Sequence, residues 1–179
     1  MPSVSQEALA DSAAALQSGD IDAALLVRNR EEHRGPSDFD DTTIEVIRLT
    51  LERTPVLLRD CPPEYLAPLR IAAAMMELWG TNNIRHFVRI EGEIDYRLDE
   101  EGIAHSLHSH ACFLARIQSI GEAGIGRVKL LGSGDPTDCD ACCAAHDQVY
   151  DIADVPELPL ADCRCESGYG CRLVAIAIP

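Results

Sequence analysis

The chain has 179 residues and carries a formal net charge of −15, because 30 acidic residues face only 15 lysines and arginines. Its apolar fraction of 46% is ordinary for a globular protein and argues against wholesale disorder. A negative chain repels phosphate groups, so we expect neither nucleic acid nor an anionic membrane as a partner.

No segment indicates a membrane or a secretory route. The longest apolar runs, at 71–76 and 173–178, are far shorter than the roughly 20 residues of a membrane-spanning helix. The first 16 residues have neither the basic nor the apolar region of a targeting peptide. We therefore expect a cytoplasmic protein in a reducing compartment.

The first helices are predicted from apolar spacing and from capping residues. Apolar residues recur at helical spacing over 9–16, and Ser18 with Gly19 ends that helix. Asp20 is a typical N-cap for a second helix, which follows directly.

Further helices are expected from residue 41 or 42, over about 64–79 and over about 99–120. The helix at 64–79 is apolar on two faces, which favours a central position in a bundle. Residues 86–98 fit both a period of two and a helix, and we favour a β-hairpin there.

Eight cysteines are the main functional signal, because six of them lie between residues 139 and 171. Clustered thiols in a reducing compartment more often bind a metal than form disulfides. A C-x2-C pair opens the cluster, and a C-x-C-x5-C group follows 20 residues later. Two such halves indicate a zinc site, with an iron–sulfur cluster as the alternative occupant. The expected ligands are Cys139, Cys142, Cys163 and Cys171, with Cys165 and His146 as alternates.

The chain divides by composition into two parts. The glycine-rich sequence at 121–134 predicts a linker between a helical body, 1–129, and a cysteine-rich module, 130–179. The apolar run at 173–178 reads as a buried strand of that module. The predicted fold is mainly α, a helical N-terminal bundle followed by a small zinc-stabilised β module.

Several features of the module recur together: a C-x2-C pair, a short strand ending in an aromatic residue, a Leu-Pro pair and a late cysteine group. They comprise Cys139, Cys142, Val149-Tyr150, Leu158-Pro159-Leu160, Cys163 and Cys171-Arg172. In this the module resembles the C-terminal module of head-morphogenesis (minor head) proteins of tailed phages, and similar modules of uncharacterised bacterial proteins. The sequence departs from that pattern at 146–147, where the family has Asp-Gly, and at 161–162, where it has His-Pro. The resemblance implies a metal-held fold rather than a reaction.

A second group of metal-binding side chains falls on the predicted helix at 99–120. His105, His108 and Cys112 share one face of it, opposite the apolar stripe. Such a face can chelate a metal, and the alternative interpretation is a second packing face. His110 lies on the apolar stripe and is expected to be a hydrogen-bonded core histidine.

These patterns favour a non-enzymatic zinc-binding protein that interacts with a protein partner or with itself, its zinc being structural. A closed set of thiolates leaves no open position for a reacting water. The alternative is a thiol-based metal or redox sensor, in which the surplus thiols of Cys143 and Cys165 allow oxidation to release the ion. A metal-dependent enzyme using the His105 face is a third hypothesis.

Overall fold

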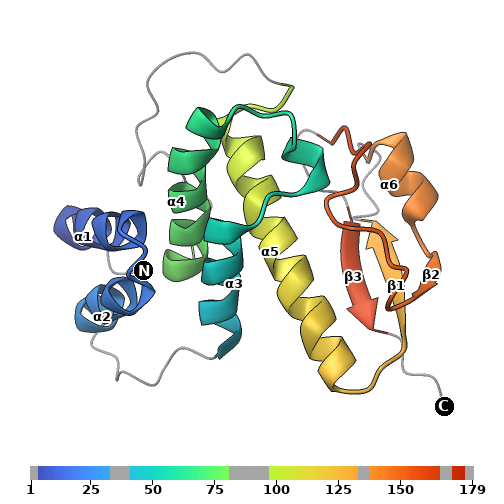
Figure 1. Ribbon diagram of the computed structural model, residues 1–179, viewed down its shortest axis with the longest axis horizontal. Helices are drawn as coiled ribbons and strands as arrows, with labels where there is room; N and C mark the ends of the chain where they lie inside the picture. The colour runs from blue at the N-terminus through green and yellow to red at the C-terminus, as the bar shows by residue number, and fades with distance from the viewer. Residues whose placement is uncertain (1–3, 33–40, 81–96, 133–137, 166–170, 176–179) are drawn as a thin grey trace.

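The computed structural model describes residues 4–32, 41–80, 97–132, 138–165 and 171–175, with the backbone alone for residues 32 and 171–175. The described chain is mainly α-helical with a small β element, which confirms the predicted fold class. In Figure 1, α1 and α2 lie at one end of the molecule, α6 and the sheet at the other, and α4 and α5 between them. The elements in chain order are α1 (Gln6–Gln17), α2 (Ile21–Glu32), α3 (Asp41–Glu52), the 3₁₀ helix η1 (Val56–Leu58), α4 (Pro63–Trp79), α5 (Glu100–Glu122), β1 (Arg127–Gly132), α6 (Asp140–Ala145), β2 (Val149–Asp151) and β3 (Cys171–Ala175).

Helices α1 and α2 form a hairpin whose turn follows the predicted signals. Gly19 takes a φ of 80°, in the left-handed region that favours glycine. Asp20 then caps α2, since its Oδ1 accepts a hydrogen bond from the backbone N–H of Ala23 at 2.9 Å. The hairpin packs on α3 and α4 through one apolar cluster, which includes Leu9, Leu16, Leu25, Ile47, Met75 and Leu78.

Helix α4 is buried on two sides, as its sequence predicts. One set of its apolar residues belongs to the cluster shared with α1 and α2, and another set packs toward α5. The helix ends at Gly80, whose φ is 63° and whose N–H donates to the carbonyl of Met76. Helix α5 begins after Asp99, whose Oδ1 accepts from the N–H of Gly102 at 2.8 Å. Both helices therefore match the predicted spans to within a few residues.

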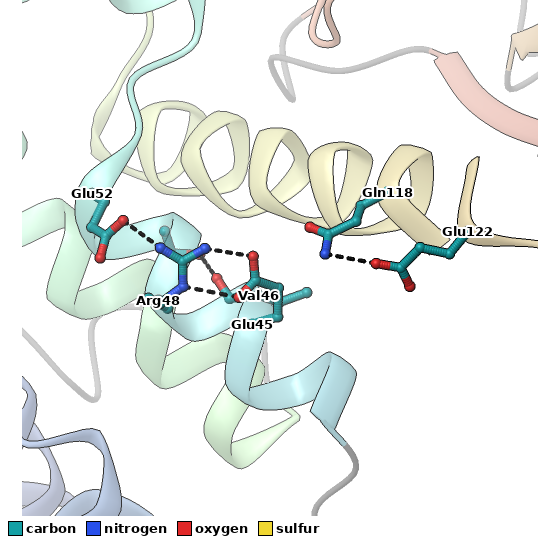
Figure 2. A network of polar contacts seen from close by, with 7 residues as sticks. Glu45, Val46, Arg48, Glu52, Gln118 and Glu122 are labelled. Atoms are coloured by element: carbon teal, nitrogen blue, oxygen red, sulfur yellow. Dashed lines mark hydrogen bonds and ion pairs between the residues drawn. The ribbon is translucent and has the colours of Figure 1, made fainter. Parts of the chain in front are cut away.

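Polar contacts cover the solvent side of α3 and the end of α5 (Figure 2). The guanidinium of Arg48 donates to Glu45 at 2.6 Å and to Glu52 at 2.7 Å. This contact lowers the pKa of the Glu45 carboxyl below its usual value. On α5 the amide of Gln118 donates to Glu122 at 3.0 Å. Exposed contacts of this kind each contribute only about 0.3–0.5 kcal/mol, so they do not determine the fold.

The β element is an antiparallel three-stranded sheet in the order β2-β1-β3. Val128 of β1 lies opposite Tyr150 of β2 on one side and Ala175 of β3 on the other. The prediction of a linker over 121–134 is therefore wrong for β1, which is the central strand. Val128 and Leu130 are fully buried on either side of a half-buried Lys129. Polar and apolar residues alternate only from Arg127 to Leu130 before Leu131 breaks the pattern, and a glycine stands on either side of the strand's core, at 126 and 132.

The cysteine-rich module packs directly on the helical body. Its buried cysteines belong to the same apolar cluster as η1 and residues of α4 and α5. A second cluster joins Phe113 of α5 to Leu130 of β1 and Leu158. The predicted boundary between residues 129 and 130 falls inside β1.

Two further expectations concern a β-hairpin before α5 and the absence of a membrane-spanning helix. The hairpin predicted for 86–98 lies outside the described residues except for its last two, Arg97 and Leu98, which are not in a strand. Within the part of the chain that the structure describes, every helix is too short or too polar to span a lipid bilayer.

Candidate metal centre

Four thiols from two segments converge beside α6. Cys139 is the N-cap of α6, and Cys142 lies in its first turn. Cys163 and Cys165 follow a tight turn in which the N–H of Cys163 donates to the carbonyl of Leu160 at 2.9 Å. All four Sγ atoms lie within 4.8 Å of one another. The fold thus brings together two pairs of thiols that are more than 20 residues apart in the sequence.

The spacing of the sulfur atoms suits a single tetrahedral ion. The Sγ of Cys142 lies 3.6 Å from that of Cys163 and 3.8 Å from that of Cys165. Four sulfurs held at 2.3 Å from one ion lie about 3.8 Å apart at the corners of a tetrahedron. The two separations made by Cys142 therefore already match those that a tetrahedral ion requires, and the other sulfurs lie within 4.8 Å of one another.

Backbone N–H groups point at two of the sulfurs. The N–H of Arg164 donates to the Sγ of Cys139 at 3.1 Å, and the N–H of Cys139 donates to the Sγ of Cys165 at 3.4 Å. Burial raises the pKa of Cys139, but donors including the N–H groups of Arg164 and Cys142 outweigh it and lower that pKa to about 6. The local backbone thus stabilises a thiolate at this position.

The buried thiol of Cys163 has the opposite tendency. Burial raises the pKa of Cys163 to about 12. Several thiolates cannot share a buried space without a cation, because their charges repel and are poorly solvated. A divalent ion removes this penalty by compensating their charge, and metal binding releases the thiol protons. The same surface hollow as Cys163 and Cys165 is lined by two arginines, Arg97 and Arg164, and by one carboxylate, that of Asp99, so the charged side chains around it have a net positive charge.

The structure brings together three of the four expected ligands, Cys139, Cys142 and Cys163, and the fourth thiol at the cluster is the alternate, Cys165. The backbone of Cys171 opens β3 opposite Gly132, but its side chain is outside the described part of the chain. In an extended segment, residues two apart point to the same side, which lets both thiols of a C-x-C pair face one point.

Two neighbours of the cluster turn away from it. The exposed ring of His146 accepts a hydrogen bond at Nδ1 from the N–H of Gly132, at 3.0 Å, and stands outside the group of four thiols. Cys143 is exposed, and its Sγ lies 3.5 Å from the carbonyl oxygen of Asp138. Cys143 therefore shares the helix of Cys142 without sharing its site.

The second predicted face is only partly assembled. His108 and Cys112 meet each other, with 3.6 Å between Nε2 and Sγ, and the third group beside them is Glu77 of α4. Burial lowers the pKa of His108, but its hydrogen bonds to Cys112 and Glu77 outweigh burial and raise that pKa to about 9. His105 is not part of this group, and its Nε2 lies 3.8 Å from a carboxylate oxygen of Glu101.

Sequence reasoning missed Glu77, because no signal within α4 tells which of its polar residues faces α5. The neighbouring prediction for His110 is confirmed. His110 is only 3% exposed, and its Nδ1 lies 2.9 Å from the carbonyl oxygen of Leu158. It is a core histidine that ties α5 to the cysteine-rich module.

A scan against protein-family models and searches of the curated proteins and of the solved structures found no match to this chain.

Proposed function

We propose that the chain is a non-enzymatic interaction or assembly protein in which four cysteines hold one structural Zn²⁺ ion. The observation that carries the proposal is the convergence of Cys139, Cys142, Cys163 and Cys165, whose sulfur atoms all lie within 4.8 Å of one another. Three of these side chains are buried and one is half-buried. Such a set of ligands is the donor set of structural zinc sites.

The surroundings favour a structural rather than a catalytic role. Four thiolates complete a tetrahedral shell, so the ion has no open position for water or substrate. The site joins α6 to the segment that contains Cys163, and both pack against the helical body in one apolar cluster. In its described residues, the module has a small sheet and one short helix with which to stabilise itself. A structural ion in a small module supplies roughly 10–16 kcal/mol of apparent folding free energy.

Zinc is favoured over an iron–sulfur cluster by the distances between the sulfurs. The contacts of 3.6 and 3.8 Å made by Cys142 match the edge of a tetrahedron around one ion. A cage of several irons and sulfides needs more space among its cysteines than these four thiols enclose. A single iron would fit the same geometry, and visible absorption of the purified protein distinguishes it from colourless zinc.

The partner that we propose is a protein, either a second copy of the chain or another protein with a basic surface. A net charge of −15 favours a basic protein over a second copy of the chain through electrostatic complementarity, and it disfavours nucleic acid. Size-exclusion chromatography with light scattering measures the molar mass in solution and so tests self-association. An anisotropy titration at physiological salt tests nucleic acid, for which we expect no micromolar binding.

The test of the structural zinc combines metal analysis with hydrogen exchange. Protein purified under reducing conditions should contain a tightly held zinc ion at the thiols, and a strong chelator should remove it. Loss of the ion should increase amide exchange in residues 138–165. Protein that contains no metal, or that keeps full protection in these residues after metal removal, would contradict the proposal.

The second candidate, a redox sensor, is favoured by one observation. Cys143 is exposed and adjacent in sequence to the buried ligand Cys142. An exposed thiol is the group that an oxidant reaches first. Mild peroxide followed by a reductant separates the candidates: a sensor releases zinc and recovers it, whereas a purely structural site keeps its ion throughout.

A further inference from the structure

A second convergence of metal-binding atoms lies between α4 and α5, away from the four-cysteine site. Glu77 of α4 meets His108 and Cys112 of α5, and one ligand atom of each lies within 4.8 Å of the other two. The Nε2 of His108 is 2.7 Å from Oε2 of Glu77 and 3.6 Å from Sγ of Cys112. The two α5 residues are one helical turn apart, so α5 holds them on one face.

The same three residue types occur in nucleophilic triads, but the geometry here is different. In a triad the histidine uses one ring nitrogen for the nucleophile and the other for the carboxylate. Here Nε2 of His108 faces both the thiol and the carboxylate. The ring therefore cannot relay a proton between them, and the three ligand atoms converge on one point instead.

The separation between His108 and Cys112 matches that of a tetrahedral metal site, and the separation between His108 and Glu77 is shorter. Zinc held at ordinary distances by an imidazole nitrogen and a thiolate places these atoms about 3.5 Å apart, and the observed separation is 3.6 Å. The observed 2.7 Å between Nε2 and Oε2 must widen by about 0.7 Å to reach the tetrahedral edge. Glu77 can provide this movement, because its long side chain is 23% exposed.

A simple ion pair between His108 and Glu77 explains one of the two contacts. Nε2 carries at most one proton, so it cannot make a full hydrogen bond to both the carboxylate and the thiol, and Cys112 is left with the longer contact of 3.6 Å. A metal gives both neighbours of Nε2 a role, because a zinc ion with one open position takes three protein ligands. The donor set of one nitrogen, one sulfur and one carboxylate oxygen suits Zn²⁺ or Co²⁺ and does not suit Mg²⁺ or Ca²⁺, which prefer oxygen ligands.

We propose that Glu77, His108 and Cys112 form a second metal site, which takes a Zn²⁺-like cation with three protein ligands and one open position. The half-buried ligands leave that position accessible to water or to a small anionic ligand. The site is therefore expected to bind its ion less tightly than four buried thiolates do, and to exchange it with solution. It also joins α4 to α5, so occupation should hold these two helices together.

The experiment uses Co²⁺ as the probe on the full chain, purified under reducing conditions with its zinc retained. The wild-type chain should bind one further equivalent of Co²⁺ and develop the thiolate-to-cobalt absorption band of a tetrahedral site. Cys112→Ser should abolish this band, and His108→Gln should abolish binding. Glu77→Gln should weaken Co²⁺ binding by at least about 10-fold. Loss of a residue that only hydrogen-bonds to a metal ligand already lowers affinity by about that factor, and Glu77 is proposed as a ligand itself.

The matched control is His105→Gln, which makes the same change one turn earlier on α5, at a residue outside the group. It should bind Co²⁺ as the wild type does. Circular dichroism establishes that each variant is folded, and Glu77→Gln provides the test if His108→Gln does not fold. The absence of saturable Co²⁺ binding in the wild type, or equal binding by the wild type, Cys112→Ser and Glu77→Gln, would overturn the proposal. If the four-cysteine site is empty, the wild type takes up two equivalents, and the variants still bind one fewer.

Discussion

Adjacent cysteines on α6 provide a matched pair of substitutions for the four-cysteine site. Cys142 is 1% exposed and lies in the cluster, whereas its neighbour Cys143 is exposed and outside it. Cys142→Ser replaces a ligand and Cys143→Ser does not, although both make the same chemical change in the same helix. The two variants therefore separate the role of the metal from the general cost of removing a thiol.

The expected difference follows from ligand linkage. An ion present at a thousand times its dissociation constant stabilises the folded chain by about 4 kcal/mol, and zinc coupled to the folding of a small module supplies up to roughly 10–16 kcal/mol. We expect Cys142→Ser to lower the free energy of unfolding by at least about 4 kcal/mol. An exposed substitution away from any special feature changes it by no more than about 0.5 kcal/mol, which is the expectation for Cys143→Ser.

Chemical denaturation followed by circular dichroism, with and without a chelator, measures both quantities. The chelator should destabilise the wild type and Cys143→Ser by the same amount and leave Cys142→Ser unchanged. If the chelator affects Cys142→Ser as strongly as the wild type, the ion is bound elsewhere. If Cys143→Ser is as unstable as Cys142→Ser, the assignment of the ligands is wrong.

Three other predictions concern the helical body. The guanidinium of Arg70 donates to the carbonyls of Thr50 and Arg53 at the end of α3, so Arg70→Met should lower the free energy of unfolding by about 1.5–3 kcal/mol; an unchanged denaturation midpoint would refute this. Gly80→Ala places a side chain in the left-handed region with no atom near the added Cβ, so backbone strain alone should cost about 1 kcal/mol, and a melting temperature at or above that of the wild type would contradict it. Burial lowers the pKa of His105 below 6.5, so the unfolded chain binds protons more readily than the folded chain, and His105 reduces stability as the pH falls below 6.5. An NMR titration of His105 should have its midpoint below 6.5, and a midpoint above 6.5 would contradict this direction.

Helices α1 to α5 of the helical body were predictable because their signals are local, whereas the short α6 and η1 were not predicted. Asp20 caps its helix, Gly80 ends one, and the apolar spacing within each helix reflects the face that it buries. Strand β1 was not predicted, because its polar and apolar residues alternate over four positions only, from Arg127 to Leu130. The residues with which it pairs lie 20 or more positions away in the sequence.

The candidate sites show the same division between local and long-range information. The C-x2-C and C-x-C pairs mark Cys139, Cys142, Cys163 and Cys165 as candidates, but only the turn after Leu160 brings the last of these to the cluster. The position of Glu77 depends on how α4 and α5 pack, and spacing within one helix carries no such information.

The division of the chain into a helical body and a cysteine-rich module stays a prediction. The buried cysteines share an apolar cluster with η1, α4 and α5, so the module has an extensive contact with the helical body. Hydrogen exchange on Cys142→Ser decides whether the parts unfold separately. Loss of protection confined to residues 138–165 would support two cooperative units, and simultaneous loss in α4 and α5 would show one.

X-ray absorption at the zinc edge tests the central claim most directly, since it reports which atoms surround the bound ion. The measurement is made on reduced protein that contains one equivalent of zinc per chain. Four sulfur neighbours at about 2.3 Å are predicted for the site formed by Cys139, Cys142, Cys163 and Cys165. A shell dominated by nitrogen or oxygen at about 2.0–2.1 Å, or a protein that retains no zinc, would contradict the account.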